Sequence, residues 1–181
     1  MRMLTAGLFH SVDGVVESPD QWQFDSFDEE MGGLLGAMIE RVDTVILGRV
    51  GYEQWSGSWP TAGDEDGFGG FINSVPKHVA SRTLTGPLDW KNASLIDGDL
   101  DDFVRDLKAS EGGEIAVVGG ISIVRHLFFA GLLDSLTLMT HPVIAGSGRK
   151  MFEPGDPLTK LELRSLRRTS KGNAILEYAR A

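Results

Sequence analysis

Cysteine is absent from this chain of 181 residues. Its absence excludes disulfide bonds, metal sites built from thiolates and cysteine nucleophiles. An apolar run near the roughly 18 residues that span a membrane is also missing. The first ten residues are too short for a signal peptide, and Asp13 and Glu17 soon follow them. We therefore expect a cytoplasmic protein with no metal site and no contact with a membrane.

Positive charge is scarce in this sequence. Lys and Arg number 17 against 26 Asp and Glu, which gives a formal net charge of −9. Acidic groups spread along a chain repel a phosphate backbone, so we expect no nucleic-acid partner. A few local arginines are still enough to bind a small anionic ligand. With 41% apolar and 24% charged residues the composition is that of an ordinary globular protein, and residues 1–181 fit a single domain.

Hydrophobic periodicity predicts an alternation of strands and helices along the chain. The predicted strands are residues 2–10, 44–47, 77–80, 93–96, 115–118 and 133–141, followed by a hairpin of 161–168 and 174–180. The predicted helices are residues 27–39, 49–55, 67–75, 99–110 and a segment from Gly120 to about 130, and residues 56–70 resemble a surface loop. This alternation predicts an α/β fold with a mostly parallel sheet, extended at its edge by the antiparallel C-terminal hairpin.

Two predicted strands end in residues that suit an anion. Gly48 and Arg49 follow the strand 44–47 and open a helix, which brings backbone N–H groups and a guanidinium together. Ser81 and Arg82 follow the strand 77–80, and a hydroxyl beside a guanidinium suits a phosphate monoester. A plain turn and solvated surface arginines are the structural alternative for both motifs.

A third strand end carries two glycines. The buried strand 115–118 runs into Gly119, Gly120, Ile121 and Ser122, where a helix begins. Glycines allow a pyrophosphate to approach the backbone, and the N-terminus of a helix favours its charge. The segment matches neither the G-x-G-x-x-G fingerprint nor the Walker loop. A tight turn from strand to helix is the alternative.

The substrate side offers one acidic candidate. Ser11, Asp13 and Gly14 follow the first strand, and Asp13 is a candidate acid or base. A carboxyl partly buried beside a cofactor ring is expected to have a raised pKa. The alternative is an ordinary Asp-Gly turn. Four aromatic residues could stack on a substrate ring, and a role in the hydrophobic core is an equally good interpretation of them. They are Trp22, Phe24, Trp55 and Trp59.

Five short motifs occur in a fixed order, each after a strand: Ser-x-Asp-Gly, Leu-Gly-Arg-x-x-Tyr-Glu, Ser-Arg-Thr, Gly-Gly and Pro-Val-Ile-x-Gly-x-Gly. Over nearly the whole chain this series resembles the dihydrofolate reductase-like superfamily. It is most similar to the branch that contains the reductase (C-terminal) domain of the riboflavin deaminase-reductase, here as a stand-alone domain. The resemblance implies a three-layer fold with a sheet of about eight strands, and NADPH lying across the carboxyl ends of the central ones.

The resemblance also assigns roles to the motifs. It implies that Gly48 and Arg49 open the cofactor site and that Ser81 and Arg82 hold the 2′-phosphate. It places the pyrophosphate at Gly119, Gly120, Ile121 and Ser122. It places four residues near the nicotinamide and the substrate: Ser11, Asp13, Gly14 and Trp22.

The sequence departs from the family pattern at three places. Gly51 stands where the family often has Thr, so one hydroxyl contact to the cofactor is lost or replaced. The classical folate enzymes carry a carboxylate on the first helix. Here Asp28, Glu29 and Glu30 cluster at that place, and the sequence does not tell which of them corresponds to it. The deaminase half is absent, and its zinc signature needs cysteines.

The resemblance implies an NADPH-dependent reductase of the riboflavin-biosynthesis type. It transfers hydride to a ribosylaminopyrimidine, such as 5-amino-6-(5-phosphoribosylamino)uracil, or to a related nitrogen heterocycle. Asp13 is the expected proton-handling residue, and a homodimer is expected by the same resemblance. Two alternatives stay open: a dihydrofolate or pteridine reductase, and a non-catalytic NADP-binding protein on the same fold.

Overall fold

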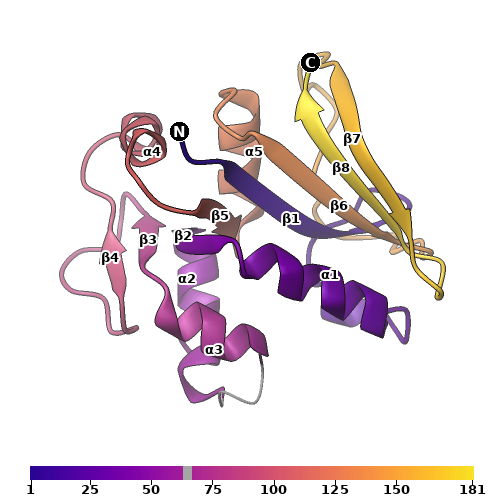
Figure 1. Ribbon diagram of the computed structural model, residues 1–181, viewed down its shortest axis with the longest axis horizontal. Coiled ribbons are helices and arrows are strands. Elements are labelled where there is room, and N and C mark those ends of the chain that lie inside the picture. The colour runs from indigo at the N-terminus through magenta and orange to yellow at the C-terminus, as the bar shows by residue number, and fades with distance from the viewer. Residues whose placement is uncertain (63–66) are drawn as a thin grey trace.

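The computed structural model describes residues 1–62 and 67–181. Within them the strands form one sheet in the order β4-β3-β2-β5-β1-β6-β8-β7 (Figure 1). The strands are β1 (Leu4–Ser11), β2 (Val42–Gly48), β3 (Lys77–Ala80), β4 (Ala93–Leu95), β5 (Glu114–Val118), β6 (Ser135–His141), β7 (Leu161–Arg168) and β8 (Ala174–Arg180). The helices are α1 (Glu29–Ile39), α2 (Arg49–Trp55), α3 (Gly67–Ser74), α4 (Leu100–Ala109) and α5 (Ile121–Phe129), with 3-10 turns at Pro19–Gln21 and Trp59–Thr61.

The sheet is mixed and mostly parallel, as the sequence predicted. Neighbouring strands from β4 to β6 all run parallel. Only β8 runs antiparallel, and it lies between β6 and the edge strand β7. The hairpin therefore extends the sheet at one edge, and its second strand rather than its first contacts the rest of the sheet.

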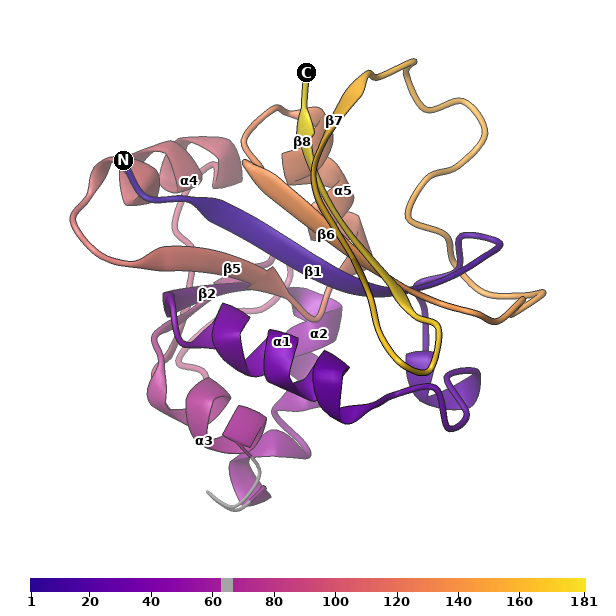
Figure 2. The ribbon, with the colours of Figure 1, turned by 45° about the vertical axis from the view of Figure 1, so that its right-hand side comes forward.

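Helices cover both faces of the sheet, which gives three layers. On one face α4 and α5 pack on β1 and β5 around Val104, Leu127 and Ile115. On the other face lie α1, α2 and α3 (Figures 1 and 2). Ile72 of α3 packs there against Val79 of β3. The carboxyl ends of the parallel strands are thereby left between the two helical layers, where open α/β sheets bind their ligands.

The predicted loop 56–70 is partly structured. It contains the 3-10 turn Trp59–Thr61, and α3 begins at Gly67. Residues 63–66 of this predicted loop lie outside the described residues. Among the described residues, no helix is both long and apolar enough to cross a membrane, and no three His, Asp or Glu side chains gather as metal ligands.

Helix α1 is amphipathic but only partly buried. Its predicted apolar face is present, yet Met31 is its one fully buried residue within the described helix. Leu34, Leu35 and Met38 are half-buried because they line a cavity between this helix and the sheet. The helix therefore forms a wall of the candidate site as well as part of the core.

Candidate cofactor and substrate site

A cavity of about 1900 Å³ opens at the carboxyl ends of the central strands. The structure brings all eight predicted cofactor residues to its wall: Gly48, Arg49, Ser81, Arg82, Gly119, Gly120, Ile121 and Ser122. They lie far apart in the sequence, but β2, β3 and β5 are adjacent in the sheet and end at the same edge. A single surface therefore carries every motif that the sequence proposed for an anionic cofactor.

The turn between β5 and α5 is shaped for an anion. Gly119 has a φ of +61°, a left-handed conformation that favours glycine. Gly120 is the N-cap of α5 and offers no side chain to accept from the first-turn N–H groups. These groups are therefore available to a ligand, and the helix dipole adds partial positive charge. Two neighbouring phosphates fit this chemistry.

Cationic groups flank this turn. Arg49 forms an ion pair with Glu53 at 2.7 Å, and both side chains are about half exposed. Arg82 is exposed and makes no ion pair within the described residues. The hydroxyl of Ser81 accepts the backbone N–H groups of Thr83 and Leu84 at 3.1 and 2.9 Å. Its proton can turn either to a ligand or to the Thr83 hydroxyl, which lies 3.5 Å away. A phosphate at this place would meet one hydroxyl donor and one free guanidinium.

Gly51 departs from the family pattern for a steric reason. A Cβ atom at this position would lie 1.7 Å from the carbonyl oxygen of Gly119. Helix α2 therefore touches the backbone of the β5–α5 turn, and no side chain fits between them. The hydroxyl expected from the family pattern cannot occur in this arrangement.

The predicted substrate residues Ser11, Asp13, Gly14 and Trp22 are not among the cavity lining. Asp13 instead joins two loops. Its carboxylate accepts the backbone N–H groups of Ala145 and Gly146 at 2.9 and 3.0 Å, and the Ser11 hydroxyl donates to it at 2.7 Å. Gly14 closes a turn by donating its N–H to the carbonyl of Ser11.

The raised pKa expected for Asp13 is wrong. The hydrogen bond from Ser11 and those from the backbone of Ala145 and Gly146 stabilise its ionised form and lower its pKa to about 2. A carboxyl with this pKa is ionised near neutrality and is a poor proton donor there. The proposed catalytic role stays a prediction, and unchanged turnover in Asp13→Asn would contradict it.

The low pKa of Asp13 predicts a pH effect on stability. Because the pKa in the folded protein is below the ordinary value of 3.8, this group stabilises the fold fully above about pH 4 and loses that contribution as the pH falls toward 2. We expect Asp13→Asn to melt lower than the wild type at pH 6 and to lose less melting temperature between pH 4 and 2. Thermal melts over this range measure both effects. Parallel pH curves for the two proteins would contradict the assignment.

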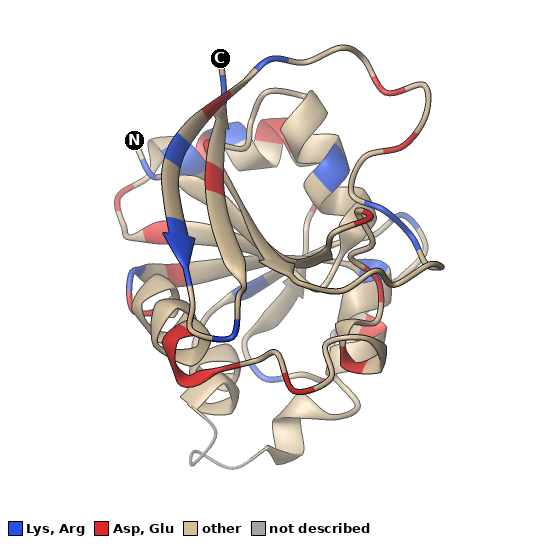
Figure 3. Ribbon diagram, turned by 90° about the vertical axis from the view of Figure 1, so that its right-hand side faces the viewer, with Lys and Arg blue, Asp and Glu red and all other residues tan. Residues whose placement is uncertain are grey.

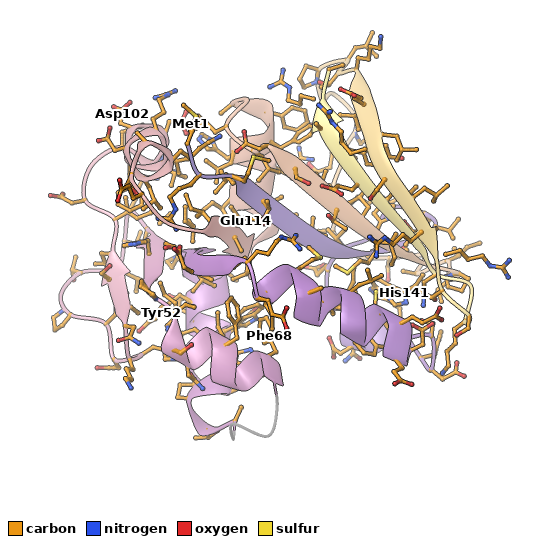
Figure 4. All side chains as sticks on the ribbon, in the orientation of Figure 1. Met1, Tyr52, Phe68, Asp102, Glu114 and His141 are labelled. Atoms are coloured by element: carbon orange, nitrogen blue, oxygen red, sulfur yellow. The ribbon has the colours of Figure 1, made fainter. Side chains whose placement is uncertain are left out.

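Trp22 has a core role in this structure. Its indole is buried, and its Nε1 donates to the carbonyl oxygen of Glu17 at 2.8 Å. It packs edge-on against His141, which Figure 4 labels near the start of α1. The aromatic residues that line the cavity are instead Phe9, Phe27, Trp55, Trp59 and Phe68. Phe24 is 80% exposed and lies outside the cavity lining.

His141 is a buried residue that the sequence did not single out. Its Nδ1 lies 2.6 Å from the Ser26 hydroxyl, and its Nε2 lies 3.0 Å from the amide of Gln23. Burial lowers its pKa, although Asp28 opposes the shift. The neutral ring therefore fastens the segment around Trp22 to the end of β6.

The three acidic residues at the start of α1 are also outside the cavity lining. Asp28 caps the helix by accepting from the N–H of Met31 at 2.9 Å, and Glu30 accepts the backbone N–H of Ser170. Figure 3 shows this acidic helix start beneath the turn between β7 and β8. Glu29 does not line the cavity either. No carboxylate of this cluster therefore lines the cavity, where the classical folate pattern implied one.

Several polar residues of the cavity wall were not predicted from the sequence. Arg149 lines the cavity, and its guanidinium donates to the Ser122 hydroxyl at 2.9 Å. Glu17 lines it as well and accepts the backbone N–H of Arg149. Arg149 follows the Gly-x-Gly segment directly, which was the available signal. No local pattern marks Thr137 or Glu177, which line the cavity from the middle of two strands.

The three layers, the strand order and the cavity at the carboxyl ends define a dihydrofolate reductase-like α/β domain. The chain belongs to the RibD C-terminal domain family, whose pattern it matches over residues 2–175. It is 26% identical over 181 residues to the uncharacterized protein YyaP of Bacillus subtilis, covering 98% of this chain and 94% of that protein.

Two solved structures share the fold. A provisionally named riboflavin biosynthesis protein from Shewanella sp. PV-4 has a TM-score of 0.74 at 21% identity, over 99% of both chains. The dihydrofolate reductase of Enterococcus faecalis, solved with NADP(H), has a TM-score of 0.61 at 14% identity, over 98% of this chain and 96% of that one. These similarities establish the fold.

Proposed function

We propose that this protein is an NADPH-dependent reductase of the riboflavin-biosynthesis type. It transfers hydride to a ribosylaminopyrimidine, such as 5-amino-6-(5-phosphoribosylamino)uracil, or to a related nitrogen heterocycle. The observation that carries the proposal is the gathering of all eight predicted cofactor residues around one cavity. Membership of the RibD C-terminal domain family supports the reductase class.

The residues of the cavity fit a phosphorylated dinucleotide. The uncapped first turn of α5, with Gly119 and Gly120 before it, suits the pyrophosphate. Ser81 and Arg82 suit the 2′-phosphate that distinguishes NADPH from NADH. NADPH supplies the hydride when bound, and the chain supplies position and a site shielded from water.

Arg82→Ala is expected to narrow the preference for NADPH over NADH. A hydrogen bond to a charged group contributes about 1.5–3 kcal/mol, so the loss of the guanidinium should weaken NADPH binding by roughly tenfold to a hundredfold. NADH lacks the 2′-phosphate and should bind as before. Tryptophan fluorescence measures both affinities, because Trp55 and Trp59 line the cavity.

The matched control is Arg105→Ala, which removes an exposed arginine from α4 that does not line the cavity. It should leave both affinities unchanged. An equal loss of NADPH and NADH binding in Arg82→Ala would contradict the 2′-phosphate assignment. Failure of the wild type to bind either cofactor would overturn the reductase proposal. Tight binding of NADPH without turnover of any heterocycle would favour a non-catalytic role.

We also propose, from the family resemblance, that the protein acts in the cytoplasm as a homodimer. Light scattering on the purified protein measures its mass in solution. A monomer at micromolar concentration would contradict this proposal and leave the cofactor assignment untouched.

A further inference from the structure

Lys77 is a buried cation that the proposed function does not use. The residue opens β3 and is fully buried, at 0% exposure. Its Nζ donates to the carbonyl oxygens of Ile72 and Val75 at 2.7 and 2.8 Å, and it lies 4.9 Å from the centre of the Trp90 ring. Its ammonium makes no ion pair within the part of the chain that the structure describes. A cation buried without an anion costs free energy, so these three contacts are what stabilises the charge.

The two carbonyl groups that Lys77 binds lie at the end of α3. The last carbonyl oxygens of a helix have no partner inside the helix, and here side chains supply the partners. Lys77 supplies two of them. The Asn92 amide donates to the two carbonyls in between, those of Asn73 and Ser74, at 3.3 and 3.0 Å. The end of α3 is therefore fastened to the start of β3 and to the segment before β4.

A chain of contacts runs from Lys77 to an aromatic wall of the cavity. The Trp90 ring that faces Nζ donates its Nε1 to Asn73 Oδ1 at 2.8 Å, and Asn73 Nδ2 donates to the carbonyl oxygen of Trp59 at 2.9 Å. Trp59 and Phe68 both line the cavity, and their ring centres are 4.9 Å apart. Figure 4 labels Phe68 between α3 and α1. Lys77 is therefore joined to this wall along two routes, through α3 and through Asn73.

Few charges surround Lys77. Helix α3 and strand β4 carry no charged residue, and the next residue of β3, His78, points to the opposite face of the sheet. Burial lowers the pKa of Lys77 to about 8, and the positive charge of Lys91 adds to the lowering. The other charged and titratable residues on the elements around it are Asp43, Arg49, Tyr52, Glu53 and Asp89. Near neutral pH Lys77 is therefore protonated in the fold, and it loses its proton in a mildly alkaline range.

We propose that Lys77 is a positioning residue for the cavity, and that its ammonium holds the wall formed by Trp59 and Phe68 in the place where a ligand meets it. The neutral amine loses the attraction to the Trp90 ring and the charge-assisted bonds to the end of α3, so it holds the wall less firmly. Ligand affinity therefore falls when this proton is lost. The inference rests on the proposed function in one respect, which is the choice of NADPH as the ligand that reports on the wall.

The first measurement follows the wall without a ligand. Labelling with 5-fluorotryptophan gives four fluorine resonances, one for each Trp, and replacing each Trp by Phe in turn assigns them. In the wild type the resonances of Trp90 and Trp59 should shift together with a midpoint near pH 8. The resonance of Trp22, which packs against His141, should stay in place between about pH 7 and 9.5, because a histidine titrates near pH 6.5 or below when its pKa is lowered.

Two variants test whether Lys77 causes these shifts. Lys77→Met keeps a side chain of similar length without the charge and should abolish both shifts. Lys91→Gln removes the positive charge that helps to lower the pKa of Lys77, so the shared midpoint should move to higher pH. Lys91 is exposed, and Lys91→Gln therefore tests the proposal even if Lys77→Met does not fold.

The second measurement is the affinity for NADPH over the same pH range. A cation–π contact corresponds to a factor of roughly two at an exposed site and thirty at a desolvated one, so the affinity of the wild type should fall by about threefold or more. A phosphate monoester has its second pKa near about 6, so the charge of the 2′-phosphate stays constant over this range. Lys77→Met should bind NADPH with the reduced affinity throughout.

Stability separates a positioned wall from a general loosening of the fold. The pKa of Lys77 is lower in the fold than its ordinary value of 10.5, so this group adds stability as the pH rises from about 8 toward 10.5. The melting temperature of the wild type should therefore rise relative to that of Lys77→Met while its NADPH affinity falls. A fall of both together would indicate general loosening and would overturn the proposal.

Separate midpoints for Trp90 and Trp59, or an unchanged midpoint in Lys91→Gln, would also overturn it. The two measurements distinguish this inference from the proposed function. If Trp90 and Trp59 titrate together but the wild type does not bind NADPH, the reductase proposal fails and the positioning of the wall by Lys77 stands. If NADPH binds with the same affinity on both sides of pH 8, the positioning role fails and the reductase proposal stands.

Discussion

Gly51→Ala is expected to destabilise the fold and to weaken NADPH binding together. The added methyl carbon would lie 1.7 Å from the carbonyl oxygen of Gly119 and 2.6 Å from its carbonyl carbon. Both atoms are backbone, so the clash cannot be relieved by a side-chain rotation, and α2 or the β5–α5 turn must move. Overpacking costs about 1–3 kcal/mol and occasionally more, and we expect the upper end here. At roughly 2–4 °C for each kcal/mol in a domain of this size, the melting temperature should fall by about 6–12 °C.

The moved turn is the one proposed to hold the pyrophosphate, so NADPH affinity should fall even at temperatures where the variant is folded. The matched control is Gly33→Ala on α1, where a Cβ meets no atom within 4 Å. It should raise stability by about 0.5–1 kcal/mol, because alanine is the better helix former, and leave NADPH binding unchanged. A wild-type melting temperature in Gly51→Ala would refute the close contact between α2 and the turn.

The fold could be predicted from the sequence because its signals are local. Runs such as Val45–Leu47 and Ile115–Val118 are continuously apolar and rich in β-branched residues, as central strands buried on both faces are. The residues proposed to bind the cofactor lie together for a related reason. Each follows such a strand directly, so predicting parallel strands was enough to bring them to one edge of the sheet. No side-chain geometry was needed for that step.

The surroundings of the residues proposed to bind the substrate could not be predicted, because their contacts join distant segments. The partners of Asp13 are backbone groups of Ala145 and Gly146, and no local pattern shows that a loop so far along the chain lies beside it. The alternative interpretation of Asp13 as part of an Asp-Gly turn agrees better with these contacts than its interpretation as a buried acid. Likewise, Thr137 and Glu177 of the cavity wall meet only through the register of β6 and β8. That register depends on the turn and packing of the C-terminal hairpin.

Ser122→Asp is expected to abolish NADPH binding while leaving the fold intact. Ser122 lies in the first turn of α5, where the helix dipole favours a carboxylate by about 0.3–1 kcal/mol. The new charge can also pair with Arg149, whose guanidinium is 2.9 Å from the Ser122 hydroxyl. The melting temperature should therefore stay level or rise. A pyrophosphate at this turn would meet like charge, and two unit charges 4 Å apart repel by about 4 kcal/mol at an effective dielectric constant of roughly 20.

Binding of NADPH should consequently weaken by at least about a hundredfold, since each 1.4 kcal/mol is a factor of ten in affinity. The pairing of Arg149 with the new carboxylate also removes a cation from the surroundings of the pyrophosphate. Ser122→Asn is the matched control, because it has nearly the same shape without the charge and should lose no more than about tenfold. Differential scanning fluorimetry with and without NADPH reports both quantities in one measurement. If Ser122→Asp retains the thermal shift that NADPH gives the wild type, the pyrophosphate does not lie at α5, and the shared edge of β2, β3 and β5 must bind a different part of the ligand.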